Sequence, residues 1–357
     1  MFEKTYSLSL NKDYVAHWGL AEAVRELIQN ALDSDSPFVY AFKKTEDTYS
    51  LSLRSEFTTL SPKTLLLGST SKAENKDAIG SFGEGYKIAL LVLTRLGRPV
   101  SIANGDKSWV PSFKYNGKFE QELLVVTEAS LPYKHTGLTF EVGGLTVDDC
   151  ESIRDSCLQM QGNVGAVKSS YHGDILLERP GKLYVGGLFI CNTDLDYGYN
   201  MHPSTIRLER DRQTVSSYDL KANTRDMWFL TQEFDRVAVM IDAGSPDVAY
   251  AEYSSNELVR EACYRLFKTK NPGAVVAKDN EQLKEMVERG MTNVVVVHSA
   301  MYENVSTSKS YRSEGFVSVE PVCDVLARWL KKNKGKMQAS AIVAFKELIV
   351  TSKNWKR

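Results

Sequence analysis

The chain has 357 residues, of which 43% are hydrophobic and 25% are charged, and its formal net charge at pH 7 is −1. At about 150 residues per domain, this length allows two or three domains. The longest wholly apolar runs, Ile88–Leu93 and Val237–Ile241, are far shorter than the roughly 20 residues that span a bilayer, so we expect no membrane partner and no secretion. Five cysteines without a C-x-x-C pair suit neither a disulfide framework nor a zinc site, and we therefore expect a cytoplasmic protein.

The charge is distributed unevenly along the chain. Residues 328–357 hold nine basic side chains and one acid, a local net charge of +8, so residues 1–327 carry −9. A basic tail of this kind is suited to nucleic acid or to an acidic protein face. The alternative is a solubilising end to the last helix.

The first third of the chain has the pattern of an α+β domain. Apolar residues recur with helical spacing over Leu20–Ser34, which predicts an amphipathic helix that faces the core. Two short apolar runs, Tyr40–Phe42 and Tyr49–Leu53, predict a β-hairpin. A second helix is predicted from Gly85 to Leu96. Further strands are predicted at Val100–Ala103, Glu122–Thr127 and Leu138–Val142.

The rest of the chain predicts two further regions. The pattern up to residue 244 predicts a helix, two strands and a helical segment, in the order Val147–Leu158, Asp174–Leu177, Lys182–Phe189 and Ser217–Ile241. Beyond Gly244 we expect a helix, a strand–helix–strand unit, a polar loop and two closing helices: Asn256–Phe267, Val275–Ala277, Glu281–Arg289, Asn293–His298, Ser306–Ser313, Val322–Leu330 and Ala339–Thr351.

Three polar residues of the first helix share one of its faces. Glu26, Asn30 and Asp33 lie at positions i, i+4 and i+7, beside the apolar stripe. Three polar side chains therefore converge, as they would in a binding site. A solvated polar face explains the same pattern, so this helix alone does not assign a site.

A glycine-rich stretch precedes the second helix. Gly80, Gly83 and Gly85 allow close approach of a ligand to the backbone, and the amides at a helix N-terminus supply the partial positive charge that phosphate requires. The order G-x-x-G-x-G is neither a Walker A loop nor a Rossmann fingerprint. A flexible glycine loop is the alternative.

Four segments together resemble a known ATP-binding fold. In order and spacing, Glu26–Asp33, Leu67–Lys72, Ile79–Gly85 and Thr136–Phe140 resemble the Bergerat fold of the gyrase, heat-shock chaperone, histidine kinase and MutL (GHKL) superfamily. The resemblance covers about residues 14–142. It implies a Bergerat-type α/β sandwich that binds ATP and Mg²⁺.

Two later segments, Leu183–Ile190 and Ile206–Gln213, resemble the transducer domain that follows this fold in gyrase, MutL and the chaperones. The resemblance thus implies an α+β protein of three parts: an ATP-binding domain over 1–145, a transducer-like α/β domain over 146–244, and a C-terminal α/β and helical region with a basic tail over 245–357.

The resemblance also assigns roles to the polar face of the first helix. Asn30 matches the asparagine that binds magnesium through its side-chain oxygen. Glu26 matches the glutamate that deprotonates the attacking water in the hydrolysing members. Asp33 belongs to the same motif and is expected near the nucleotide.

Other positions are expected to contact the nucleotide. Arg212 matches the transducer residue that reaches the γ-phosphate, with Arg210 as the alternative; a structural arginine paired with Glu209 or Asp211 explains Arg212 equally well. The remaining matches are the lid and phosphate-contacting residues, a lysine that neutralises phosphate charge, and the threonine near the adenine: Ile79, Gly80, Gly83, Gly85, Lys72 or Lys87, and Thr139.

One family motif is missing. The usual D-x-G-x-G has an aspartate that accepts a hydrogen bond from the adenine amino group, and Ser55 occupies that position here. Glu56 after a register shift, or a water held by Ser55, would replace the acceptor. A site that recognises phosphates alone is the other alternative.

These observations predict a magnesium-dependent conformational ATPase of the GHKL type that hydrolyses ATP and dimerises on nucleotide binding; its protein client is not identifiable. A rival prediction is a degenerate nucleotide-sensing scaffold without turnover, which the missing D-x-G-x-G favours. A third is an ATP-gated clamp that binds nucleic acid through the basic tail.

Overall fold

The structure is a computed structural model that describes residues 3–34, 36–66, 84–206, 208, 215–314 and 322–352. It is a mixed α/β protein that divides into two compact units. The first comprises Met1–Glu233 and Ser245–Ala249, and the second comprises Phe234–Gly244 and Tyr250–Arg357. The three-part division expected from the sequence stays a prediction. No helix among the described residues has both the length and the apolar composition that crossing a bilayer requires.

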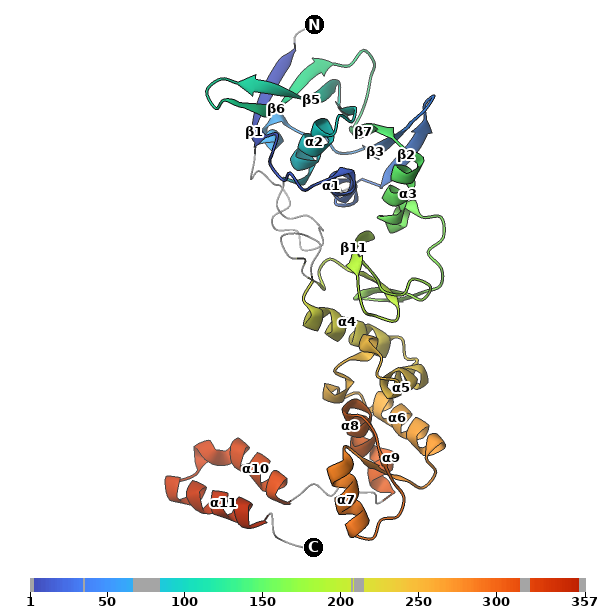
Figure 1. The fold of residues 1–357 in the computed structure, drawn as a ribbon, viewed down its shortest axis with the longest axis vertical. Coiled ribbons are helices and arrows are strands. Elements are labelled where there is room, and N and C mark those ends of the chain that lie inside the picture. The colour runs from blue at the N-terminus through green and yellow to red at the C-terminus, as the bar shows by residue number, and fades with distance from the viewer. Residues whose placement is uncertain are drawn as a thin grey trace. The chain divides into compact units, whose positions relative to one another are not determined.

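The first unit begins with an antiparallel sheet of seven strands in the order β1-β6-β5-β4-β7-β3-β2 (Figure 1). The predicted hairpin and the three predicted strands are confirmed, whereas β1 and β5 were not predicted. Strand β5 contains Pro111, which lacks the N–H donor that a central strand uses. The strands are β1 (Lys4–Asn11), β2 (Val39–Lys44), β3 (Tyr49–Ser55), β4 (Val100–Asn104), β5 (Lys107–Asn116), β6 (Gln121–Ser130) and β7 (Leu138–Leu145).

Two helices, α1 (Leu20–Leu32) and α2 (Gly85–Arg95), pack against each other and against one face of this sheet (Figure 1). Both predicted helices are therefore confirmed. Leu51 and Leu53 on β3 are almost fully buried and belong to the core that these helices cover. Because side chains alternate along a strand, β3 presents its odd-numbered residues to the helices.

Arg95, at the end of α2, holds the loop that leads into α1. Its guanidinium donates to the backbone oxygens of Lys12, Tyr14, Val15 and Trp18 at 3.1, 3.0, 3.2 and 2.9 Å. The Glu22 carboxylate accepts from the Gly19 amide at 2.9 Å and thereby caps the start of α1. Arg95 of α2 and the cap at Gly19 therefore both fix where α1 begins.

A second sheet follows in the same unit, with the order β11-β10-β12-β9-β8. The expected single strand Lys182–Phe189 is wrong: the chain turns at Gly186 and Gly187, both with positive φ, so two strands form. The elements are α3 (Val147–Asp155), η2 (Leu158–Met160), β8 (Val167–Ser170), β9 (Gly173–Leu176), β10 (Lys182–Val185), β11 (Leu188–Asn192), β12 (Gly198–Met201), α4 (Ser217–Leu230) and η3 (Pro246–Val248).

A buried carboxylate anchors the returning segment Ser245–Ala249 to this part of the unit. Asp247 is fully buried and accepts hydrogen bonds from the Asp196 amide at 2.6 Å, the Tyr197 amide at 3.2 Å and the Tyr199 hydroxyl. The Trp228 indole donates to the same hydroxyl at 2.8 Å. Burial raises the pKa of Asp247 above its usual value, although its hydrogen bonds oppose the shift. The network is one continuous polar cluster inside the fold.

We expect Asp247→Ala to destabilise the first unit by about 3 kcal/mol or more, because three donors, among them the fully buried Tyr199 hydroxyl, lose their common acceptor. Urea denaturation followed by tryptophan fluorescence measures this, since Trp228 belongs to the network. Asp106→Ala, in the same unit, is the control: its carboxylate is 81% exposed in an ion pair with Lys107, and its loss should cost less than about 1 kcal/mol. Equal stability of the two variants would contradict the role assigned to Asp247.

The second unit is mainly helical. It contains the predicted strand–helix–strand unit, whose two strands pair in parallel. The loop expected over Ser306–Ser313 is wrong: two helices meet there, because Ser308 caps the second and Tyr311 is buried. The elements are α5 (Phe234–Asp242), η4 (Ala251–Tyr253), α6 (Glu257–Lys270), β13 (Val275–Ala277), α7 (Asn280–Glu288), β14 (Val294–Val296), α8 (Ser299–Thr307), α9 (Lys309–Ser313), α10 (Val322–Asn333), η5 (Lys334–Lys336) and α11 (Ala339–Ser352).

Candidate functional site

The polar face of α1 is organised around Asn30. The Asn30 amide nitrogen donates to the backbone oxygen of Glu26, one turn earlier, at 2.7 Å. A carbonyl oxygen accepts only from the NH₂ end of the amide, so this bond fixes which way the amide lies. Asn30 Oδ1 therefore faces away from the helix, and no donor among the described residues contacts it. An oxygen presented in this way suits a hard cation such as Mg²⁺.

Glu26 does not lie on a solvated face. Only 2% of its surface is exposed, and the neighbouring Gln29 is buried to the same extent. Glutamate is rarely buried this completely in a merely solvated helix face. The solvated-face explanation of the Glu26, Asn30 and Asp33 pattern is therefore wrong for Glu26. Asp33 is the half-buried residue that ends α1.

The end of β3 meets this side of α1. Ser55, the last residue of β3, is 5% exposed, and its hydroxyl lies 3.3 Å from that of Ser34. Ser34 follows Asn30 by four residues, just beyond the end of the helix. Ser55 is therefore close to the end of α1, and its assignment to the adenine position stays a prediction.

Strand β7 approaches β3 closely beside Ser55. Gly137 has φ +80°, and a Cβ there would lie 2.4 Å from the Ser55 backbone oxygen, so only glycine fits. Ser55 pairs with Leu138, the next residue, and both face the helices. The β7 side chain beside Ser55 is thus aliphatic.

Thr139 lies on the opposite face of the sheet from Ser55. It pairs with Arg54, and its hydroxyl is 3.4 Å from His135 Nε2. Successive strand residues point to opposite faces, so the structure does not bring Thr139 and Ser55 together. Glu56 forms an ion pair with Arg54 at 3.5 Å and is exposed, so its carboxylate also lies away from Ser55.

Two residues that were not predicted hold the segment after β3. Asn104 donates to the Leu60 backbone oxygen at 2.7 Å and accepts from the Leu60 amide at 2.8 Å. Ser36 accepts from the Phe57 amide at 2.9 Å. The Asn104-Gly105 pair is typical of a hairpin turn, which conceals the long-range role of the asparagine. These bonds determine the path of the chain where the D-x-G-x-G motif would stand.

The first turn of α2 holds a buried lysine. Gly85 begins the helix, and the Lys87 side chain is fully buried with its ammonium donating to the Leu66 backbone oxygen. Burial lowers the pKa of Lys87, and the nearby Glu84 carboxylate partly opposes this shift. Lys87 is therefore a buried lysine and not a solvent-exposed one.

Tyr86 holds the same approach segment. Its hydroxyl donates to the Thr64 backbone oxygen and also lies 2.9 Å from the Thr64 hydroxyl, within the 3₁₀ turn η1 (Pro62–Leu65). Burial raises the pKa of Tyr86 to about 12. The start of α2 is thus tied at two adjacent residues to the chain that enters the glycine-rich stretch.

Several predicted site residues lie outside the described part of the chain. They are Lys72, Ile79, Gly80, Gly83, Arg212 and its alternative Arg210. Their predicted roles stay predictions.

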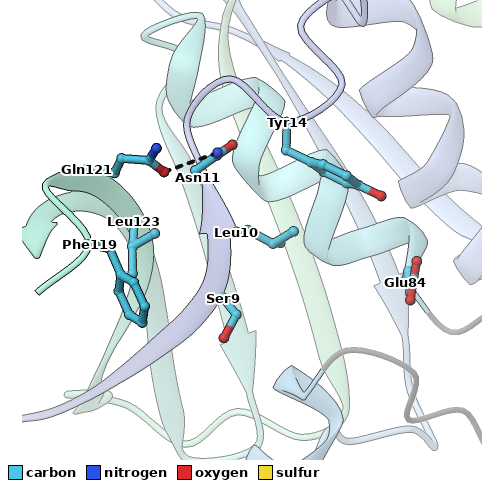
Figure 2. A pocket seen from close by; sticks show the side chains of 8 residues that line it. All are labelled: Ser9, Leu10, Asn11, Tyr14, Glu84, Phe119, Gln121 and Leu123. Carbon is cyan, nitrogen blue, oxygen red and sulfur yellow. Dashed lines mark hydrogen bonds between the residues drawn. The ribbon is translucent and has the colours of Figure 1, made fainter.

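A cavity of about 430 Å³ lies beside Glu84, just before α2 (Figure 2). Leu10 and Leu123 contribute apolar surface, and the Asn11 and Gln121 side chains hydrogen bond to each other at 3.2 Å. Among the described residues that line it, the charged one is the Glu84 carboxylate. The described lining of this cavity, with its single carboxylate, does not suit phosphate.

The described residues contain no group of three or more His, Cys, Asp or Glu side chains placed to hold a metal ion.

No protein-family model matches the chain. It is 26% identical over 231 residues to a protein of Mycoplasma pneumoniae that is described as uncharacterized. The matched region covers 60% of this chain and 94% of that relative. This similarity shows that most of the relative's length has a counterpart here, and it carries no activity.

Proposed function

We propose that this protein binds ATP with magnesium and hydrolyses it, as a conformational ATPase of the GHKL type. The observations that support the proposal are the burial of Glu26, the Asn30 amide one turn later on the same helix, and the approach of the end of β3 to Ser34 at the end of that helix. Helix α2, which packs beside α1, begins with the glycine that ends the predicted phosphate-binding stretch. A Bergerat-type arrangement requires this combination.

In this proposal each described residue has one role. Asn30 would hold the magnesium ion, whose charge would neutralise part of the phosphate charge. Glu26 would accept a proton from the attacking water as a general base. The Lys87 side chain donates to the Leu66 backbone oxygen and so ties the start of α2 to the chain that enters the predicted phosphate-binding stretch.

Adenine recognition is the weakest part of the family pattern in this chain. Ser55 offers a hydroxyl in place of a carboxylate, and Thr139 lies on the other face of the sheet. We therefore propose that the Ser55 and Ser34 hydroxyls, with a water between them and the base, replace the missing carboxylate. Base selectivity would then be lower than in relatives with D-x-G-x-G.

Ser55→Asp tests this assignment. A carboxylate at this position accepts from the amino group of adenine but repels the carbonyl oxygen of guanine. We expect affinity for ATP to rise relative to GTP by about 1 kcal/mol or more, after the cost of burying the charge. Calorimetric titration of both nucleotides measures it. Ser50→Asp, on the opposite face of β3, is the control, and an equal change for the two nucleotides in Ser55→Asp would remove Ser55 from the base site.

The direct test of the proposed function is a calorimetric titration of the full chain with ATP, with and without Mg²⁺, followed by an assay of phosphate release. Magnesium-dependent binding with turnover supports the ATPase. Binding without turnover supports the nucleotide-sensing scaffold, which the serine at position 55 favours. Absence of binding to any nucleoside triphosphate contradicts both. Size-exclusion chromatography with light scattering, run with and without ATP, tests the predicted dimer.

A further inference from the structure

Helices α10 and α11 form an antiparallel hairpin (Figure 1). Much of the apolar surface of this hairpin is exposed. The Trp329 and Phe345 rings stack between the two helices, with centroids 5.0 Å apart and planes inclined by 25°. Leu330, on the inner side of α10, is buried. The two helices therefore hold each other through one stripe.

Much of the remaining apolar surface of the hairpin is exposed in the described part of the chain. Trp329 remains 47% exposed, and Val343 and Val350, seven residues apart on one flank of α11, are 57% and 66% exposed. Val325 and Leu348 are also exposed. A helix that is apolar around most of its circumference is normally buried. Exposed aliphatic surface of this kind is typical of a site that contacts another protein or a membrane.

The same hairpin is basic. Residues 322–352 hold six basic and two acidic side chains, in a chain whose first 327 residues carry −9. Four of the lysines gather where α10 ends and the chain turns into α11: Lys331, Lys332, Lys334 and Lys336. No acidic residue lies between these four lysines in the sequence, and all four are exposed.

We propose that the α10–α11 hairpin binds the surface of an anionic lipid bilayer. The valines and leucine require an apolar medium, which the acyl boundary supplies, and the lysines require phosphate groups, which lie directly above it. Tryptophan prefers this boundary because its ring is apolar and its N–H is polar. The hairpin combines the three kinds of side chain in 31 residues.

Charge and surface chemistry favour this partner over two others. Nucleic acid would satisfy the lysines but would leave the valines of α11 in water. A second copy of the hairpin would cover the valines but would bring two surfaces of equal positive charge together. The expectation of no membrane partner rested on the length of apolar runs, which concerns spanning segments; a hairpin in the interface needs no such run.

Vesicle sedimentation of the full chain, without nucleotide, tests the proposal. The protein is incubated with vesicles of phosphatidylcholine alone or of phosphatidylcholine mixed with phosphatidylglycerol. We expect binding to the mixed vesicles that weakens as salt is raised, and little binding to phosphatidylcholine alone. Because no ATP is present, the result is independent of the proposed ATPase.

Two double variants separate the apolar and the charged contributions. Each lysine near an anionic membrane contributes about 1 kcal/mol to binding. Lys331→Gln with Lys332→Gln should therefore weaken binding about thirtyfold. Val343→Ser with Val350→Ser should weaken it about tenfold or more, and serine is as good a helix former as valine. Matched controls on α7 are Lys284→Gln and Val287→Ser, which are exposed to a similar degree. Circular dichroism verifies that each variant remains folded.

Three outcomes would overturn the proposal. One is equal binding to both kinds of vesicle or to neither. Another is a dimer in the absence of vesicles that Val343→Ser with Val350→Ser dissociates, which would make a second copy the partner. The third is binding to double-stranded DNA that outcompetes the vesicles and depends on the lysines but not on the valines.

Discussion

Asn30→Ala is expected to abolish magnesium-dependent ATP binding, with a loss of affinity of at least about 100-fold. Alanine removes the side-chain oxygen that the bond from the Asn30 amide nitrogen to Glu26 leaves available. The helix itself should persist, because its apolar stripe is unchanged and alanine is the better helix former. Calorimetry with and without Mg²⁺ measures the effect, and circular dichroism verifies the fold.

Asn333→Ala is the matched control for that variant. The Asn333 amide donates to the backbone oxygen of Trp329, four residues earlier, at 2.9 Å, which repeats the bond between Asn30 and Glu26. Any general effect of losing such a bond appears in both variants. Unchanged ATP affinity in a folded Asn30→Ala protein would remove Asn30 from the site.

Glu26→Gln is expected to preserve ATP binding and to reduce turnover by about 100-fold or more, the usual scale for loss of a general base. Glutamine has the shape of glutamate, so the buried packing around this side chain is retained, but it does not accept the proton of water. Single-turnover measurement of phosphate release, together with a binding titration, separates the two effects.

Glu22→Gln serves as the control on the same helix. Its side chain caps α1 through an oxygen that the amide keeps, so turnover should change little. If Glu26→Gln binds ATP and hydrolyses it at the rate of the unmodified protein, Glu26 is not the base. If Glu26→Gln loses binding instead, its role is structural.

The sheet register bears on how the adenine would be read. Ser55 and Leu138 form a pair that faces α1 and α2, whereas Thr139 and Arg54 form the next pair and face the other way. A hydroxyl on β7 therefore does not reach the base from the same side as Ser55. In the proposed function Ser55 is therefore the main residue that recognises the base, and the Ser55→Asp experiment tests this role most directly.

Local patterns in the sequence determined much of the fold. Helical spacing of apolar residues predicted α1, and the glycine followed by an apolar run predicted the start of α2 at Gly85. The strand–helix–strand unit near Val275 was predicted in the same way. These features depend on residues that are near one another in the chain, and side-chain periodicity alone reports them. The shared face of Glu26 and Asn30 belongs to the same class.

Tertiary contacts decided the features that pair distant residues. The burial of Glu26 and Lys87, the bonds from Asn104 to Leu60 and the acceptor role of Asp247 each depend on segments that are far apart in the sequence. No local pattern contains such information, because the partner and its distance are set only when the sheet and helices assemble. The side of the sheet that Thr139 occupies is likewise a matter of register, since a shift of one residue reverses every side chain on a strand.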